Sequence, residues 1–218
     1  MRGRLVPGPE RDRVRRDVEK GWMGGIPFLW DRFVIADATG RHGVGRSIAE
    51  LAGGGDPYDT MLDLLAEFGG LIRIVLFYRV EEDVSAFLAH PLASVGSDGN
   101  AIPLAQDGRA LHPRSFGTFP RVLGRYVREL GVLDLADAVH KMTAAPARRL
   151  GLPDRGEIRV GARADLLVFD PATVADNADF GTPPEAPVGI GTVIVNGVVA
   201  LDDGVITDAR PGRVLLRA

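Results

Sequence analysis

The apolar residues of this chain change their spacing once, near residue 152, and this change constrains the fold more than any other feature. Before it, short and almost wholly apolar runs alternate with segments in which apolar residues recur at helical spacing. After it, apolar and polar residues alternate. The first pattern is typical of buried strands separated by amphipathic helices, and the second is typical of half-exposed strands. We therefore expect two parts, residues 1–152 and residues 153–218.

The first part contains three runs that we predict to be strands, at 33–36, 71–78 and 92–96. They carry almost no charge, as expected for strands that are covered on both faces. The helical segments between them have recognisable ends, because Asp59 or Thr60 can cap one helix and Pro91 stops the other. Strands that alternate with helices of this length indicate parallel βα units.

Helices without intervening strands complete the first part. Residues 119–130 place their apolar side chains on one face, which predicts an amphipathic helix. Asp134 is a suitable N-cap for the next helix. Pro146 and Gly151 predict the start and the end of a third, short helix, since proline favours the first turn and glycine the position after the last.

The second part has the signals of a small antiparallel β module. Alternating apolar residues predict strands at 158–160, 166–169, 193–195 and 198–200. Asn196-Gly197, between the last two strands, is the strongest short signal for a β-hairpin. Residues 170–191 are rich in Pro, Gly and Asp and predict a long connection with little regular structure.

The composition argues against several classes of protein. Acidic and basic residues are mixed and the net charge is −3, so no surface for nucleic acid is indicated. The arginines of residues 11–16 alternate with aspartates, which predicts a solvated helix face. There is no cysteine, which excludes disulfides and thiolate metal ligands within the chain. No apolar stretch reaches the ~20 residues that span a bilayer, and no signal peptide is visible, so we expect a cytoplasmic protein.

Two residues of the first part are candidates for a functional site. Asp98, in Ser97-Asp98-Gly99, follows the predicted strand 92–96. This tripeptide is common turn chemistry, but functional groups of βα barrels also lie at the C-terminal ends of strands. Arg114 lies in the predicted loop before the helix 119–130. It is either a solvated charge or a clamp for a substrate carboxylate, because its guanidinium matches two oxygens.

Other residues that often carry chemistry have simpler explanations here. The histidines, at positions 42, 90, 112 and 140, lack the close spacing of a metal-binding motif. His140 falls within a predicted helix and His90 at a helix end, so both are expected to be structural. Glycines 53–55 lack the lysine and the strand-to-helix context of a phosphate-binding loop and predict a flexible loop.

The run 112–129, His-Pro-Arg-Ser-Phe-Gly-Thr-Phe-Pro-Arg-Val-Leu-Gly-Arg-Tyr-Val-Arg-Glu, resembles the signature of the N-acyl-D-amino-acid deacylase (D-aminoacylase) family of the amidohydrolases. The segment 164–170, Ala-Asp-Leu-Leu-Val-Phe-Asp, resembles the part that follows the barrel in amidohydrolases more widely. Asn196-Gly197 and Pro211-Gly212-Arg213 also fit. The resemblance covers nearly the whole chain and is most specific from about residue 92 onward.

The resemblance implies a fold, a reaction and roles for both candidates. The family fold is a distorted (β/α)8 barrel with a small β-sandwich to which both chain ends contribute. The substrate class is N-acyl-D-amino acids, and the metal is zinc. Asp98 matches the aspartate that contacts the metal and its bound water, accepts a proton as general base and returns it to the leaving amine. Arg114 matches the arginine that helps to bind the substrate. Such chemistry is coherent, because Zn²⁺ lowers the pKa of bound water.

The departures from the family limit this expectation. The family's other metal ligands belong to its first half, and residue 1 of this chain aligns with the middle of the family. We therefore expect the C-terminal portion of the barrel (1–152) followed by the β-sandwich module (153–218), with Asp98 as the one metal-site residue. We expect the isolated chain to be inactive.

The alternatives are a non-catalytic fragment, a structural half that needs a partner chain or self-association, and a hydantoinase-like or dihydroorotase-like specificity. The spacing between Asp98 and His112 is longer than in some members of the family.

Overall fold

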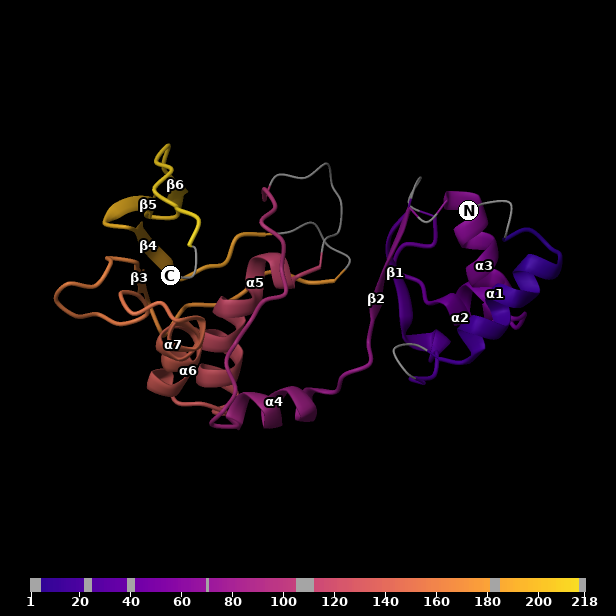
Figure 1. The fold of residues 1–218 in the computed structure, drawn as a ribbon, viewed down its shortest axis with the longest axis horizontal. Helices are drawn as coiled ribbons and strands as arrows, with labels where there is room; N and C mark the ends of the chain where they lie inside the picture. The colour runs from indigo at the N-terminus through magenta and orange to yellow at the C-terminus, as the bar shows by residue number, and fades with distance from the viewer. Residues whose placement is uncertain are drawn as a thin grey trace. The chain divides into compact units, whose positions relative to one another are not determined.

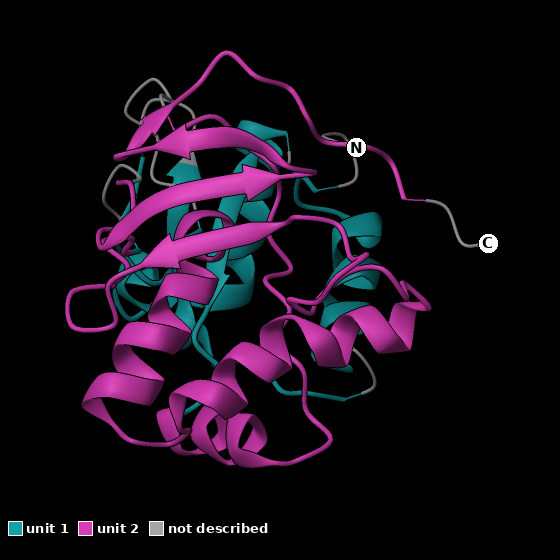
Figure 2. Ribbon diagram, turned by 90° about the vertical axis from the view of Figure 1, so that its left-hand side faces the viewer, with its two compact units in different colours: residues 1–80, 107–112, 180–183 teal, residues 81–106, 113–179, 184–218 magenta. Residues whose placement is uncertain are grey.

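The computed structural model describes residues 5–21, 25–38, 42–69, 71–104, 112–180 and 185–215. The chain divides into two compact units, which Figure 2 draws in different colours. The first comprises residues 1–80 with the short segments 107–112 and 180–183. The second comprises residues 81–106, 113–179 and 184–218. No helix of the described residues has both the length and the apolar character that a membrane span requires.

The first unit combines helices with a two-stranded sheet (Figure 1). Its elements are α1 (Pro9–Glu19), a 3-10 turn (Trp30–Arg32), β1 (Phe33–Ala38), α2 (Ile48–Ala52), α3 (Pro57–Phe68) and β2 (Ile72–Leu76). Phe33, Ile35, Ile48 and Leu64 form its buried core. Because β-branched and aromatic side chains of β1 pack against α2 and α3, burial of these residues holds the sheet and the helices together.

The strands β1 and β2 pair antiparallel, with Val34 opposite Val75 and Ile35 opposite Ile74. The expected parallel arrangement is therefore wrong for this pair, although both strands lie where the apolar runs predict them. Parallel ladders are slightly less stable per residue and occur in sheets whose strands have neighbours and whose faces are covered. In the described part of the first unit these two strands form a two-stranded sheet, and Val34 also bridges Ser47 antiparallel, a setting that favours the antiparallel ladder.

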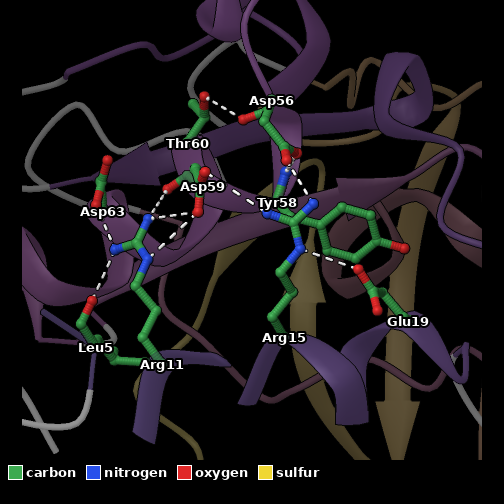
Figure 3. A network of polar contacts seen from close by, with 9 residues as sticks. All are labelled: Leu5, Arg11, Arg15, Glu19, Asp56, Tyr58, Asp59, Thr60 and Asp63. Carbon is green, nitrogen blue, oxygen red and sulfur yellow. Dashed lines mark hydrogen bonds and ion pairs between the residues drawn. The ribbon is translucent and has the colours of Figure 1, made fainter. Parts of the chain in front are cut away.

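Arginines of α1 attach this helix to α3 (Figure 3). Arg11 is 7% exposed and contacts Asp59 at 3.0 Å and Asp63 at 2.5 Å. Arg15 contacts Asp56 at 2.5 Å. The expected solvated helix face is therefore wrong for Arg11. Its carboxylate partners are about fifty positions away in the sequence, beyond the range of a local charge pattern.

Helix α3 also begins earlier than the sequence predicted. Asp56, rather than Asp59 or Thr60, is the N-cap, and its carboxylate accepts a hydrogen bond from the amide of Tyr58. Proline at the first helical position suits this start. The glycines 53–55 lie in the turn between α2 and α3, where Gly53 ends α2 with a φ of 57°. This agrees with the expected loop.

The second unit contains helices and a four-stranded sheet. Its helices are α4 (Glu81–Ala89), α5 (Arg114–Arg121), the π-helix η4 (Val122–Glu129), α6 (Leu135–Met142) and α7 (Ala144–Leu150). Asp134 caps α6 by accepting the amide of Asp137, and Gly151 ends α7 with a φ of 71°. Both signals are confirmed. The helix predicted at 119–130 begins at Arg114, so this arginine lies in a first helical turn and not in a loop.

The sheet of the second unit is antiparallel throughout, with the order β3 (Leu166–Phe169), β4 (Ile190–Val195), β5 (Val198–Asp202) and β6 (Val205–Ile206). The hairpin between β4 and β5 is confirmed, and Asn196 and Gly197 have φ values of 49° and 80°. Residues 158–160 form no strand; Ile158 and Val160 are 91% and 101% exposed. The long connection after β3 contributes Val174, which is fully buried against Leu123 and Tyr126 in the core of this unit.

Leu92 lies in a turn and residues 93–96 have no regular structure, so the strand predicted at 92–96 is not formed in the described structure. The amide of Val95 donates to the carbonyl of Lys141 in α6, at 3.1 Å, and not to a neighbouring strand. The side chain of Val95 packs against the core of the second unit. The apolar run therefore belongs to a segment that is attached to helices. The spacing of apolar residues cannot distinguish such a segment from a buried strand. The boundary near residue 152 stays a prediction.

Candidate functional site

Asp98 lies in the loop that follows residues 92–96, in a local turn where the hydroxyl of Ser97 accepts the amide of Gly99. The φ of Asp98 is 48°, the left-handed region that aspartate tolerates better than most residues. At Gly99 a Cβ atom would lie 2.9 Å from the carbonyl oxygen of Arg114 and from the Cα atom of Ser115. Glycine is therefore required where the turn touches the start of α5. The turn chemistry and the functional hypothesis for this tripeptide both remain compatible with the structure.

Arg114 and Asp98 form an ion pair, with 2.9 Å between Nη1 and Oδ2. The side chains are 41% and 87% exposed, respectively. Exposed ion pairs contribute little to stability, typically about 0–1 kcal/mol. The pair therefore fixes the relative orientation of two charged side chains at the surface of the second unit more than it stabilises the fold.

Hydrogen bonds fix the backbone on both sides of Asp98. The hydroxyl of Ser97 accepts the amide of Gly99 at 3.1 Å. The amide of Asn100 donates to the hydroxyl of Ser115, in the first turn of α5, at 3.2 Å. No sequence pattern singles out Ser115, although it follows Arg114 directly in the motif. Its hydroxyl couples the turn of Asp98 to the helix that carries Arg114.

The histidines do not gather around this pair in the described structure. The ring of His112 packs edge-on against Phe180 at 5.0 Å, and the ring of His42 lies 5.7 Å from Phe68. His90 accepts the amide of Leu92 through Nδ1, which agrees with its expected structural role. His140 is exposed on α6. Residues 105–111, which belong to the spacing between Asp98 and His112, lie outside the described residues.

Tyr126 and its polar neighbours belong to the core behind α5. Burial raises the pKa of Tyr126 above its ordinary value of 10.0, and the nearby Glu81 carboxylate raises it further. Arg121 pairs with Asp176 at 3.4 Å. The phenol is therefore neutral near pH 7, and we assign it a role in packing rather than in proton transfer.

The described residues do not fit a resident metal ion. Among them, no group of three or more His, Asp or Glu side chains could hold one. A catalytic zinc site takes about three protein ligands and leaves a position for water. Asp98 offers one carboxylate, which already contacts Arg114. Any metal used with this pair must therefore be held mainly by groups other than the described residues.

Comparison with known proteins gives this geometry a family context. The model of the Amidohydrolase family matches residues 36–201. The chain is 45% identical over 175 residues to the D-aminoacylase of Alcaligenes xylosoxydans xylosoxydans, which covers 79% of this chain and 34% of that protein. The chain thus spans about a third of the length of this curated relative.

Solved structures show the same similarity. A D-aminoacylase studied for its binuclear metal centre matches with a TM-score of 0.71 and 39% identity, over 85% of this chain and 38% of that one. The N-acyl-D-glutamate deacylase of Bordetella bronchiseptica, complexed with zinc and a phosphonate inhibitor, matches with a TM-score of 0.70 and 39% identity, over 86% and 38%. The α/β fold is therefore like that of the D-aminoacylase amidohydrolases.

Proposed function

The chain belongs to the amidohydrolase family, and from this membership we propose that it forms the C-terminal part of a metal-dependent N-acyl-D-amino-acid deacylase. In this proposal residues 1–152 are the last portion of a (β/α)8 barrel and residues 153–218 belong to its β-sandwich. The match to about a third of a D-aminoacylase supports this assignment. Zinc is the metal, and its other ligands come from the rest of the enzyme.

The ion pair between Asp98 and Arg114 is the observation that carries the proposal. A deacylase must bind an acid and hydrolyse an amide beside it. The guanidinium of Arg114 can bind the α-carboxylate of the substrate with two parallel hydrogen bonds. Because both side chains are exposed, a substrate carboxylate can replace Asp98 on Arg114 and leave the Asp98 carboxylate available to accept a proton.

Asp98 then acts as the proton carrier of the hydrolysis. It takes a proton from the attacking water while the water oxygen bonds to the amide carbon. When the carbon–nitrogen bond breaks, Asp98 returns this proton to the leaving nitrogen. The products are a carboxylic acid and a free D-amino acid, so the carboxylate is regenerated. General acid–base catalysis of this kind contributes about 10²- to 10⁴-fold to a rate.

A structural half that needs a partner polypeptide is the second candidate. The edge strand β6 favours it, because Val205 and Ile206 are 68% and 74% exposed. Exposed apolar edge strands invite pairing with another chain. The two candidates differ in one respect: a purely structural half needs neither Asp98 nor Arg114 for the activity of the assembled enzyme.

A hybrid enzyme tests the proposal. In it, the 175 matched residues of the D-aminoacylase of Alcaligenes xylosoxydans xylosoxydans are replaced by those of this chain. We expect the hybrid to hydrolyse N-acetyl-D-methionine or N-acetyl-D-glutamate and to leave the L-enantiomers intact. A folded, zinc-loaded hybrid that hydrolyses neither D-substrate would contradict the proposed function.

A further inference from the structure

Lys141 is a buried cation that the mechanism above does not use. It lies on α6 and is 4% exposed. Its Nζ donates to the carbonyl oxygen of His90 at 2.5 Å. Its own carbonyl accepts the amide of Val95 at 3.1 Å. One residue therefore holds the segment that leads to Asp98 at two points.

The acceptor of this ammonium is a helix end. His90 follows the last residue of α4, and the carbonyls at a helix C-terminus carry partial negative charge and lack helical partners. The same carbonyl also accepts the amide of Ala93, at 3.0 Å, which closes the turn after α4. Burying an ammonium is unfavourable unless it gains such a partner. An apolar side chain would fill the same space without the cost of burying a charge. We therefore expect the hydrogen bond from Lys141 to His90 to have a specific role.

Arg149 of α7 adds a third contact. Its Nη2 donates to the carbonyl of Leu92 at 2.5 Å. Residues 90–95 are thus attached to α6 and α7 through two carbonyls and one amide. In a sheet, neighbouring strands would make such contacts, but this segment pairs with no strand in the described structure. Lys141 and Arg149 take the place of those neighbours.

Asp98 depends on this attachment. Its side chain is 87% exposed, so packing does little to fix it. The backbone before Asp98 is held at Val95, and the backbone after it is held at Asn100 by Ser115. We propose that Lys141 is a positioning residue, which fixes the segment 90–95 and thereby places Asp98 opposite Arg114. The catalytic consequence rests on the proposed function, whereas the positioning itself does not.

Amide hydrogen exchange of the full chain, measured by NMR, tests the positioning. Lys141→Met keeps the length of the side chain and removes the ammonium. We expect exchange at Val95 and Asn100 to accelerate about ten- to a hundredfold, as for the loss of a charged hydrogen bond. Lys141→Arg restores a cationic donor and should return both rates toward those of the original chain.

Two neighbouring arginines provide a matched pair that does not depend on the buried site. Arg149→Met removes the contact to Leu92 and should accelerate exchange in residues 92–100. Arg148→Met, one position away, removes the contacts to Glu157 and, among the described residues, no hydrogen bond or ion pair to residues 92–100, so it should leave exchange there unchanged. Unchanged exchange at Val95 in Lys141→Met, or equal acceleration throughout α6, α7 and β3, would overturn the proposal.

The hybrid enzyme separates this inference from the proposed function. There Lys141→Met should lower kcat about tenfold or more and change KM less than about threefold, because Asp98 moves while Arg114 remains on α5. Lys141→Arg should recover most of the lost kcat. A decrease in kcat that is accompanied by an equally large increase in KM would overturn the positioning role. An inactive hybrid would contradict the proposed function, while the exchange rates would still decide the role of Lys141.

Discussion

Nη1 of Arg114 lies 2.9 Å from Oδ2 of Asp98, and the backbone that follows Asp98 is tied to α5 by the hydroxyl of Ser115. The arginine belongs to the first turn of the helix, and the aspartate belongs to the loop that touches it. The helix therefore gives Arg114 a rigid support, whereas the conformation of Asp98 is set by the backbone contacts of its loop. A substrate carboxylate that binds Arg114 must therefore compete with Asp98.

Arg114→Ala in the hybrid enzyme should raise KM more than it lowers kcat. The loss of a charge-assisted pair with the substrate carboxylate corresponds to about a ten- to hundredfold increase in KM. Steady-state kinetics on N-acetyl-D-methionine and on its carboxamide measure the effect. The carboxamide should respond much less, because it lacks the charged group. An equal loss on both substrates would instead indicate that Arg114 only supports the fold.

Arg11→Met should destabilise the full chain by about 1–3 kcal/mol, since a nearly buried guanidinium loses its charged hydrogen bonds. Its partners Asp59 and Asp63 are half to two-thirds exposed and regain water, which keeps the effect moderate. Urea unfolding measures the change. Arg16→Met, on the same helix, is the control and should shift the midpoint little. Equal stability of the two variants would show that the contacts of Figure 3 do not stabilise α1.

The capping box of α2 makes part of the stability depend on pH. Hydrogen bonds from the backbone and the side chain of Ser47 lower the pKa of Glu50 below its ordinary value of 4.5. A depressed folded pKa means that the carboxylate stabilises the fold above its unfolded pKa and loses this contribution as pH falls through the folded pKa. Glu50→Gln should therefore be less stable than the original chain at pH 7 and approach it at pH 3. A difference in the urea midpoint that is as large at pH 3 as at pH 7 would contradict this linkage.

The isolated chain should hydrolyse no N-acyl-D-amino acid, even with excess Zn²⁺. The described residues hold no group of three ligands for a metal, and Asp98 alone cannot retain zinc against water. The measurement combines an assay on N-acetyl-D-glutamate with metal analysis after gel filtration. Turnover together with one tightly bound zinc per chain would show that the chain forms a metal site by itself or by association.

Features determined by neighbouring residues were predictable from the sequence. Asn196 and Gly197 supply the two positive φ values of the hairpin, and Asp134 and Gly151 supply a cap and a helix end. Each of these signals acts within a few positions, so the sequence contains the whole interaction. The turn at Asp98 belongs to the same class, because Ser97-Asp98-Gly99 carries its own hydrogen bond.

Features that depend on distant partners were not predictable. The orientation of β1 depends on β2, the burial of Arg11 depends on aspartates of α3, and the contact of Lys141 reaches back to His90. The helix expected at 119–130 began too late, although Phe116 lies three positions before Phe119, at helical spacing, and α5 begins at Arg114. Consequently the sequence identified both members of the candidate pair but neither Ser115 nor Lys141, which hold the loop of Asp98.

The kcat of Asp98→Asn in the hybrid enzyme tests the central claim most directly. Asparagine keeps the size of the side chain and removes its ability to accept and return a proton. We expect kcat to fall by about 10²- to 10⁴-fold, with the zinc content and the urea midpoint unchanged. Turnover within a few-fold of the unaltered hybrid would show that Asp98 carries no proton and would contradict the proposed mechanism.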